Sequence, residues 1–393
     1  MVSDTLQQAL LPAGIVDVLP SDAAHEAAVL DRVMGILAGH GYEHVKPPLV
    51  EFEESLVSGL GTAVTHQTFR LMDPVSQRMM GLRADMTPQV ARMAATRLAG
   101  APRPMRLSYA GQVVRVKGSQ MRPERQFTQV GAELIGAAAT TADAEIIALA
   151  AETLTSVGVE DLSIDLGMPT LVPAVCRDFH DDTALMGRLR DALDRKDTAT
   201  VRDLAGELGD AVVATLTAMM NATGPAADGL AALEKLDLDG EAAGQREALG
   251  RVAAAVAARS PGLTLTVDPV ENRGFEYHTG VTFSIFAGKS RGELGRGGRY
   301  MAARHDGSEE PATGVSLFMD TVMRVLPPQP TQRRLFLPLD ADPADAAALR
   351  ADGWAVVEGL KAVEDAAAEA RRLNCSHLAK AGGIEELTGR NGD

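Results

Sequence analysis

Residues 125–134 constrain the fold most, because their pattern predicts a β-strand with two different faces. Successive side chains of a strand point to opposite faces of the sheet. One predicted face carries a cation, an amide and a carboxylate around a glycine; its members are Arg125, Phe127, Gln129, Gly131 and Glu133. The other face carries Gln126, Thr128, Val130, Ala132 and Leu134. The first face either binds a small ligand, for which the glycine leaves room, or is the solvated face of an antiparallel sheet.

The size and charge of the chain set broad limits. At roughly 150 residues per domain, 393 residues predict two or three domains. A hydrophobic fraction of 46% with 23% charged residues is ordinary for a folded soluble protein. The 53 acidic and 38 basic residues leave a net charge of −15, which argues against binding nucleic acid or an anionic membrane by charge alone. A local basic groove would still be compatible with this balance.

The cysteines, histidines and apolar runs exclude several classes of protein. Cys176 and Cys375 lie too far apart in sequence for a disulfide framework or a CxxC site, which favours a reducing, cytoplasmic setting. No apolar run approaches the ~18 residues of a membrane span, and the first twenty residues lack a signal-peptide pattern. His40 and His44 are separated by Gly41, which breaks the helix that would align them on a metal. We therefore expect a cytoplasmic protein without a metal or cofactor.

Local signals predict the elements of the first part of the chain. A helix begins at Ser21 and is stopped by Gly41. The extended segment 42–52 follows, and its two prolines confine it to a sheet edge or an interface. The remaining elements predicted here are a strand at 79–82, a helix at 87–97, strands at 105–116 and 125–134, a helix at 143–157 and a strand at 162–166.

The second half begins with a long helical stretch. From about residue 170 to 260 the pattern is helical and rich in Ala and Leu, which predicts an inserted helical part. The glycine cluster at 292–298 is expected to precede a helix, and the prolines of 327–330 form the clearest linker. The predicted strands lie at 263–267 and 281–286 before the linker, and at 334–337, 354–357 and 377–379 after it, where two helices complete a small α/β unit.

Three segments carry dense mixtures of charged and hydrogen-bonding groups beside predicted strands: 83–87, 125–134 and 273–278. A zwitterionic small molecule needs such a mixture. A carboxylate such as Asp85 or Glu133 can bind an ammonium group, and an arginine can bind a carboxylate with two parallel hydrogen bonds. The alternative for Arg273 is a surface ion pair, and for Tyr277 a half-buried position on a strand.

Four ordered motifs carry a resemblance to a known family. They are Leu82–Thr87, Arg122–Gln129, Arg273–Gly280 and Gly297–Tyr300. Together they resemble the catalytic core of histidyl-tRNA synthetases, and resemble still more closely the paralogous regulatory subunits of ATP phosphoribosyltransferase in histidine biosynthesis. The resemblance runs from about Pro12 to Val325.

The resemblance implies an α+β fold, in which a class II aminoacyl-tRNA synthetase-like antiparallel sheet is flanked by helices. It implies dimerisation through the segment Tyr42–Glu51. The domains expected on this basis are residues 1–169 (first part of the core), 170–260 (helical insertion), 261–327 (second part of the core) and 331–393 (small α/β C-terminal domain).

The resemblance also implies a histidine-binding site. The matching residues are Asp85, Thr87, Arg115, Gln129, Glu133, Arg273, Tyr277, His278 and Tyr300. Two of them depart from the synthetase pattern. Asp85 replaces a glutamate and so shortens the reach of the carboxylate, and His278 replaces the second of two adjacent tyrosines.

Further departures distinguish the two relatives. Arg115 matches the arginine of synthetase motif 2, but the motif 3 arginine, expected after a glycine-led helix in 314–321, is replaced by Thr321. Arg324 lies nearly one turn later. After Pro330 only a reduced α/β unit follows, and none of its elements is visibly basic, whereas a synthetase would carry a full anticodon-binding domain.

The resemblance and these departures predict a regulatory subunit without catalytic residues. It would form a homodimer within a larger hetero-oligomer with a short-form ATP phosphoribosyltransferase catalytic subunit, activate that subunit and mediate feedback inhibition by L-histidine, without binding tRNA. Two alternatives remain. One is a divergent histidyl-tRNA synthetase or other histidine-activating ligase, and the other is a dimeric scaffold with a vestigial pocket.

Overall fold

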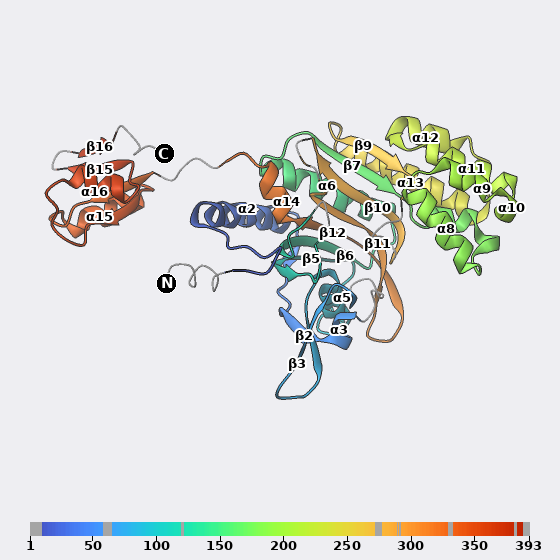
Figure 1. Ribbon diagram of the computed structural model, residues 1–393, viewed down its shortest axis with the longest axis horizontal. Helices are drawn as coiled ribbons and strands as arrows, with labels where there is room; N and C mark the ends of the chain where they lie inside the picture. Colours follow the sequence, from blue (N-terminus) through green and yellow to red (C-terminus); the bar gives the residue numbers. More distant parts are fainter. Residues whose placement is uncertain are drawn as a thin grey trace. The chain divides into compact units, whose positions relative to one another are not determined.

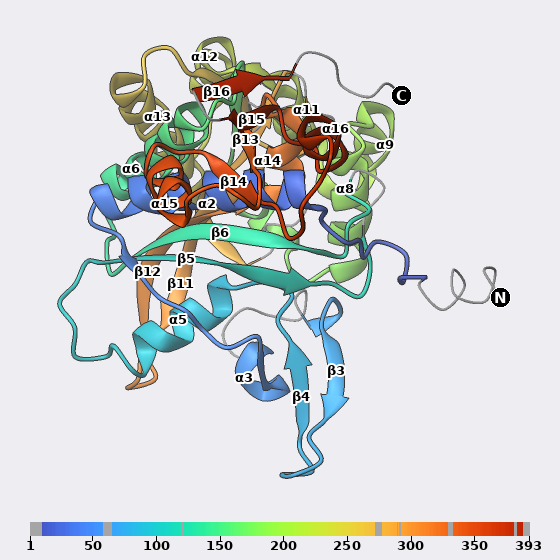
Figure 2. The same ribbon diagram turned by 90° about the vertical axis from the view of Figure 1, so that its left-hand side faces the viewer.

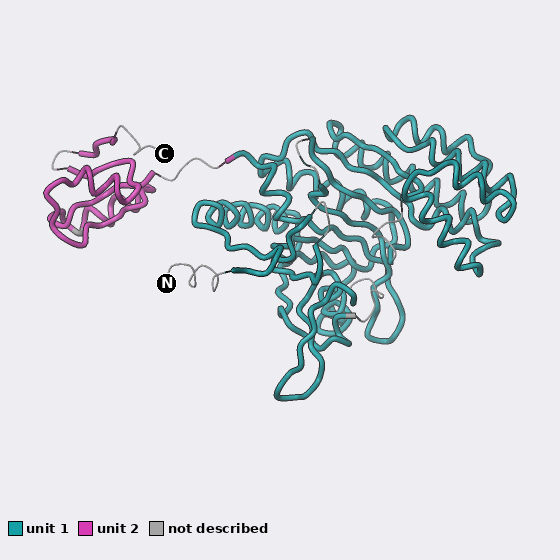
Figure 3. The backbone as a smooth tube through the Cα atoms, viewed as in Figure 1, with its two compact units in different colours: residues 1–327 teal, residues 328–393 magenta. Residues whose placement is uncertain are grey.

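The computed structural model describes two compact units, residues 1–327 and 328–393 (Figure 3). The residues whose structure is described are 10–57, 65–118, 122–271, 277–288, 290, 292–328, 333–380 and 383–387. The predicted site residue Arg273 lies outside them, so its position stays a prediction. Within the described residues, no helix combines the length and the apolar character that a membrane span requires.

The first unit is built on a nine-stranded sheet with the strand order β1-β5-β6-β12-β11-β10-β7-β9-β8. The pairs from β5 to β7 are antiparallel, whereas β1 pairs with β5 and β7 with β9 in parallel. In sheet order the strands are β1 (Glu43–His44), β5 (Met105–Val114), β6 (Gln126–Ile135), β12 (Glu309–Phe318), β11 (Gly295–Ala303), β10 (His278–Ala287), β7 (Leu162–Gly167), β9 (Thr264–Asp268) and β8 (Gly224–Pro225).

The two faces of β6 contact different hydrophobic clusters, as the alternation along residues 125–134 predicts. Val130, Ala132 and Leu134 pack in one cluster with helices α2 (Pro20–Gly39) and α6 (Thr140–Ser156). On the opposite face, Phe127 belongs to a cluster that includes residues of α5 (Thr87–Ala95). Figures 1 and 2 show α2 and α5 on opposite sides of β5 and β6. The polar side chains of β6 therefore face the side of the sheet that α5 covers.

A small sheet extends the α5 side of the first unit. It consists of β2 (Val50–Phe52), β4 (Met79–Leu82) and β3 (Phe69–Met72), paired antiparallel in that order, with the short helix α3 (Glu53–Val57) beside it. Figure 2 shows the β3–β4 hairpin projecting away from the large sheet. Of these strands, β4 was predicted as a strand, and β2 lies in the extended segment 42–52 that was predicted at a sheet edge or an interface.

Apart from the two-residue strand β8, the stretch between β7 and β9 is helical, as predicted. Asp182 and Asp197 cap two of its helices by accepting hydrogen bonds from Leu185 N (2.9 Å) and Thr200 N (3.0 Å). Figure 1 shows α8 to α12 beyond the β9 edge of the sheet. The helices are α7 (Leu171–Val175), η1 (Arg177–Phe179), α8 (Thr183–Asp194), α9 (Thr198–Asp203), α10 (Ala205–Leu208), α11 (Asp210–Asn221), α12 (Ala226–Glu234) and α13 (Gly240–Arg259). Their buried side chains join the cluster under α2 and α6, so this part is continuous with the core.

The glycine-rich region around 292–298 corrects the prediction of a following helix. Gly297 lies inside strand β11, and Gly314 lies inside β12 rather than at the start of a helix, since α14 (Met319–Val325) begins only at Met319. A Cβ atom on Gly297 would lie 2.1 Å from the carbonyl oxygen of Gly314. These glycines therefore permit close approach between strands and do not mark a helix start.

The second unit has a four-stranded sheet with the order β14-β13-β15-β16, in which only β16 is antiparallel to its neighbour. The predicted α/β alternation is present, and β16 was not predicted. Its elements are β13 (Arg334–Leu337), α15 (Pro343–Ala351), β14 (Ala355–Glu358), α16 (Ala366–Arg372), β15 (His377–Lys380) and β16 (Gly383–Glu386).

Candidate functional site

The polar face of β6 is brought together with its neighbours by the register of the sheet. Gly131 lies opposite Tyr109 on β5 and opposite Ser316 on β12. A Cβ atom on Gly131 would lie 2.2 Å from Cζ of Tyr109. The glycine thus leaves space for the tyrosine ring, which crosses the strand on this face. The result is a buried layer of polar side chains from three adjacent strands.

Glu133 lies at one end of this layer and is only 1% exposed. The hydroxyl of Tyr109 donates a hydrogen bond to Oε1 at 3.2 Å, and that of Tyr300 donates to Oε2 at 2.9 Å. Burial raises the pKa of Glu133 to about 8, while its hydrogen bonds from Tyr300 and Tyr109 oppose the shift. This end of the site therefore presents a carboxyl group whose charge is costly unless it is matched by donors or a cation.

Asp85 lies at the other end, in the turn before α5. Its Oδ1 accepts hydrogen bonds from Thr87 N at 2.9 Å and from Gln129 Nε2 at 3.1 Å. The backbone N–H of Met86 donates to Gln129 Oε1 at 2.9 Å, which holds the amide in place. A half-buried carboxylate beside an oriented amide can bind an ammonium group.

Aromatic rings border the Glu133 end. The ring centroids of Tyr277 and His278 are 4.0 Å apart, and those of Tyr277 and Tyr300 are 6.1 Å apart with their planes at 74°. His278 pairs with Tyr300 across β10 and β11. An imidazole ring bound here could stack on these rings while it hydrogen-bonds to the carboxyl group.

Arg115 lies on the Asp85 side. Its Nε donates to the carbonyl oxygen of Ala84 at 3.3 Å, and its guanidinium carbon is 5.1 Å from the centroid of the Phe127 ring. Burial lowers the pKa of Arg115 to about 10, and the charge of Asp85 opposes this shift. A guanidinium with this environment can bind a ligand carboxylate, because the anion would restore the lost solvation.

Ion pairs join the segment just before β6 to helix α14, the helix on which Thr321 stands where the synthetase pattern has an arginine. Arg122 binds Asp320 of α14 through Nη2 at 3.1 Å, and its guanidinium lies 3.8 Å from the centroid of the Phe318 ring. Arg324, which could have replaced the missing arginine, forms an ion pair with Glu124. Thr321 is buried on α14.

Of the nine predicted site residues, all except Arg273 lie in the described residues. Direct hydrogen bonds connect Asp85, Thr87, Gln129, Glu133 and Tyr300 with one another or through Tyr109, while Tyr277, His278 and Arg115 join by ring or charge contacts. Sequence reasoning missed Tyr109 and Ser316. Tyr109 stood in a predicted strand, but only the strand register shows which residues it faces, and Ser316 lay in a segment predicted to be helical.

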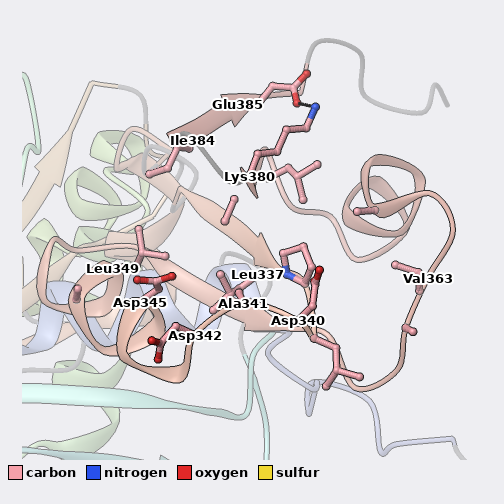
Figure 4. Close-up of a pocket in the computed structure, with 18 of the residues that line it drawn as sticks. Leu337, Asp340, Ala341, Asp342, Asp345, Leu349, Val363, Lys380, Ile384 and Glu385 are labelled. Atoms are coloured by element: carbon pink, nitrogen blue, oxygen red, sulfur yellow. Dashed lines mark ion pairs between the residues drawn. The ribbon is translucent and has the colours of Figure 1, made fainter.

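The second unit contains a separate pocket with a volume of about 1720 Å³. Its lining includes Asp342, Asp345, Lys380 and Glu385, and Figure 4 shows the ion pair between Lys380 and Glu385. Among the described residues, the lining has apolar and acidic side chains and Lys380, but neither an aromatic ring nor an arginine. It therefore lacks the groups that the sheet site offers to an aromatic zwitterion.

Comparison with known proteins gives the family. A sequence profile of the family described as histidyl-tRNA synthetase matches residues 14–322. The ATP phosphoribosyltransferase regulatory subunit of Rhodospirillum centenum is 54% identical over 382 residues, covering 97% of each chain. The regulatory subunit of Paramagnetospirillum magneticum is 53% identical and covers 98% of this chain and 100% of the relative. The chain belongs to the family of ATP phosphoribosyltransferase regulatory subunits.

The fold of this regulatory-subunit family member agrees with a solved structure. The ATP phosphoribosyltransferase regulatory subunit/histidyl-tRNA synthetase of Bacillus halodurans gives a TM-score of 0.80 at 24% identity, covering 92% of this chain and 96% of that chain. The predicted α+β, class II synthetase-like fold is thereby confirmed, as is the predicted family.

Proposed function

We propose that this chain is a non-catalytic regulatory subunit that binds L-histidine in the sheet site and joins a separate, short-form catalytic subunit of ATP phosphoribosyltransferase. That catalytic subunit makes phosphoribosyl-ATP in the first step of histidine biosynthesis. The regulatory chain activates it and mediates feedback inhibition by histidine. Relatives that are 54% and 53% identical over nearly the whole chain carry the name of regulatory subunit, which supports this role.

One observation carries the histidine assignment: two carboxyl groups, Asp85 and Glu133, lie at opposite ends of one buried hydrogen-bonded layer. Histidine has an ammonium group and an imidazole N–H that suit these two ends. Asp85 and Gln129 bind the ammonium group, Arg115 binds the carboxylate, and Glu133 accepts from the ring. The aromatic rings of Tyr277 and His278 then lie beside the imidazole.

The residues around helix α14 support a binding role without amino-acid activation by ATP. Activation of an amino acid requires cations around the phosphates of ATP in the transition state. Here Thr321 replaces one such cation, Arg324 is paired with Glu124, and Arg122 is paired with Asp320. These pairs support the absence of an ATP-activating site.

Feedback requires that histidine binds one state of the assembly better than another. A typical coupling free energy between two sites is about 1–3 kcal/mol, and the coupling acts equally in both directions. Histidine should therefore bind more tightly to the inhibited complex than to the active one. The proposed assembly contains a homodimer of this chain and binds no tRNA.

The test is isothermal titration calorimetry of histidine with the chain alone and with its catalytic subunit, copurified from the native host. We expect saturable binding to the wild type and none to the Glu133→Gln variant, together with histidine-sensitive phosphoribosyltransferase activity of the wild-type complex. An absence of histidine affinity in both the chain and the complex would contradict the proposal. Copurification without a transferase chain would also contradict it.

The synthetase alternative makes a different prediction. A divergent histidyl-tRNA synthetase or another histidine-activating ligase would catalyse histidine-dependent exchange between ATP and pyrophosphate. We expect none, and exchange above the no-enzyme background would overturn the non-catalytic assignment.

The vestigial-pocket alternative is tested by variants. In a pure scaffold, Glu133→Ala and Arg273→Ala would leave both complex formation and feedback unchanged. We expect these variants to retain the complex but to lose histidine sensitivity.

A further inference from the structure

The orientation of Gln129 can be assigned from its neighbours. The backbone N–H of Met86 is a donor, so the side-chain atom 2.9 Å from it must be the amide oxygen. The amide nitrogen then faces Asp85 Oδ1 at 3.1 Å and Ser316 Oγ at 2.7 Å. An amide nitrogen carries two protons and accepts none, so Gln129 donates in both directions.

The direction of hydrogen-bond donation can also be assigned for the hydroxyl groups of Ser316 and Tyr109. When Glu133 is ionised it only accepts, so the single proton of Tyr109 then points to Glu133 Oε1 at 3.2 Å. Tyr109 must then accept from Ser316 Oγ at 3.1 Å and from Thr87 Oγ1 at 3.0 Å. Ser316 can do this because it uses its oxygen to accept from Gln129 and its proton to donate to Tyr109. Every proton in the sequence Gln129, Ser316, Tyr109, Glu133 thus points toward Glu133.

The surroundings leave little room for water to replace these bonds. Gln129 and Tyr109 are 0% exposed, and Ser316 is 8% exposed. A Cβ atom on Gly314 would lie 1.8 Å from Glu133 Oε2, so the carboxyl group is closely confined. Among the titratable groups of the described residues, Tyr109 from β5, Tyr300 from β11 and Asp85 from the turn before α5 act on Glu133. The two tyrosines stabilise its charged form, and Asp85 destabilises it.

We propose that Ser316 and Tyr109 are positioning residues, which form a one-way hydrogen-bond relay from Gln129 to Glu133 and stabilise the ionised form of Glu133 that accepts from a ligand. The relay rests on the proposed function and adds a specificity rule: the ligand must present an N–H donor or a cation to Glu133. It also links the ammonium end and the ring end of the site, because Gln129 donates to Asp85 with its other proton.

Two variants test the relay, with a matched control. Tyr109→Phe removes the donor to Glu133, and Ser316→Ala removes the donor to Tyr109. Tyr42→Phe is the control, since Tyr42 is 2% exposed and donates to a different carboxylate, Glu145, at 3.0 Å. Carbon-13 NMR of the Glu133 carboxyl group follows its pKa, and calorimetry follows histidine affinity across the range around the pKa of about 8.

Tyr109→Phe should raise the pKa of Glu133 and weaken histidine binding near pH 7 by about tenfold or more, the loss expected for one hydrogen bond to a charged group. The loss of histidine affinity should shrink at a pH above the pKa of Glu133 in both the wild type and the variant. Ser316→Ala should cause smaller changes in the same directions, and Tyr42→Phe none. Ratios of variant to wild-type affinity at each pH cancel the titration of histidine itself.

An unchanged or lowered pKa of Glu133 in both relay variants would overturn the relay, even where histidine binds. If Tyr109→Phe does not fold, Ser316→Ala decides by the same criterion. An absence of histidine binding to the wild type contradicts the proposed function instead, while the NMR titration, which needs no ligand, still decides the relay.

Discussion

A single methyl group added at Gly314 tests the geometry of the site. In the Gly314→Ala variant the new Cβ atom would lie 1.8 Å from Oε2 and 2.4 Å from Cδ of Glu133. Unbonded atoms of this kind need about 3.5 Å, so the carboxyl group would have to move by more than about 1 Å. Such a move breaks the 2.9 Å hydrogen bond from Tyr300.

The expected cost has two parts. Overpacking of a buried site destabilises by about 1–3 kcal/mol. Loss of a hydrogen bond to a charged group adds about 1.5–3 kcal/mol. We therefore expect urea unfolding to give a free energy of unfolding lowered by about 2.5–6 kcal/mol, and histidine affinity to fall by at least about tenfold.

Two further variants show whether Glu133 is the cause. Glu133→Ala in the Gly314→Ala background removes the clashing group, so much of the lost stability should return, as expected for residues in contact. Gly250→Ala on α13 has no atom within 4 Å of its new Cβ and should be neutral or stabilising by about 0.5–1 kcal/mol. Wild-type stability and histidine affinity in Gly314→Ala would refute the geometry of this site.

Three other perturbations give separate predictions. The pKa of Glu133 is about 8 in the folded chain and near 4.5 in the unfolded chain. The folded chain therefore holds a proton that the unfolded chain has released, so the free energy of unfolding falls as the pH rises from about 4.5 to about 8. Urea unfolding at several pH values should show this fall in the wild type and not in Glu133→Gln. Lys196→Met leaves the buried Asp268 without its partner at 2.6 Å and should lower the free energy of unfolding by about 2 kcal/mol in urea; an unchanged midpoint would contradict this. Asp320→Asn breaks the nearly buried pair with Arg122 and should lower the melting temperature through a loss of about 3 kcal/mol, measured by calorimetric scanning.

Local patterns predicted local structure well. The two faces of residues 125–134 follow from the period of a strand, and α15 follows from Asp342 at its cap, which accepts from Ala344 N at 2.9 Å. The glycines near 297 misled the prediction because glycine signals only a missing Cβ. Whether that space serves a helix start or a neighbouring strand depends on tertiary contacts.

In the candidate site, too, some residues could be predicted from local sequence and others could not. Asp85, Gln129 and Glu133 could be proposed because they lie in short motifs. Tyr109 and Ser316 could not, since they meet only when β5, β6 and β12 are aligned so that both lie opposite Gly131. Strand register is non-local, and one sequence carries little direct record of it.

The surroundings of Glu133 and those of helix α14 differ in how their polar groups are paired. This difference bears on the choice between a histidine-binding regulatory subunit and a scaffold with a vestigial pocket. Around Glu133, donors are matched to acceptors through Ser316, Tyr109 and Tyr300. On the α14 side, Arg122 and Arg324 are bound by the chain's own carboxylates, Asp320 and Glu124. A buried carboxyl group with a raised pKa costs stability, and an apolar replacement of similar shape would remove that cost. A costly carboxyl group with matched donors in one half, beside paired cations in the other half, supports the proposed binding role over a vestigial pocket.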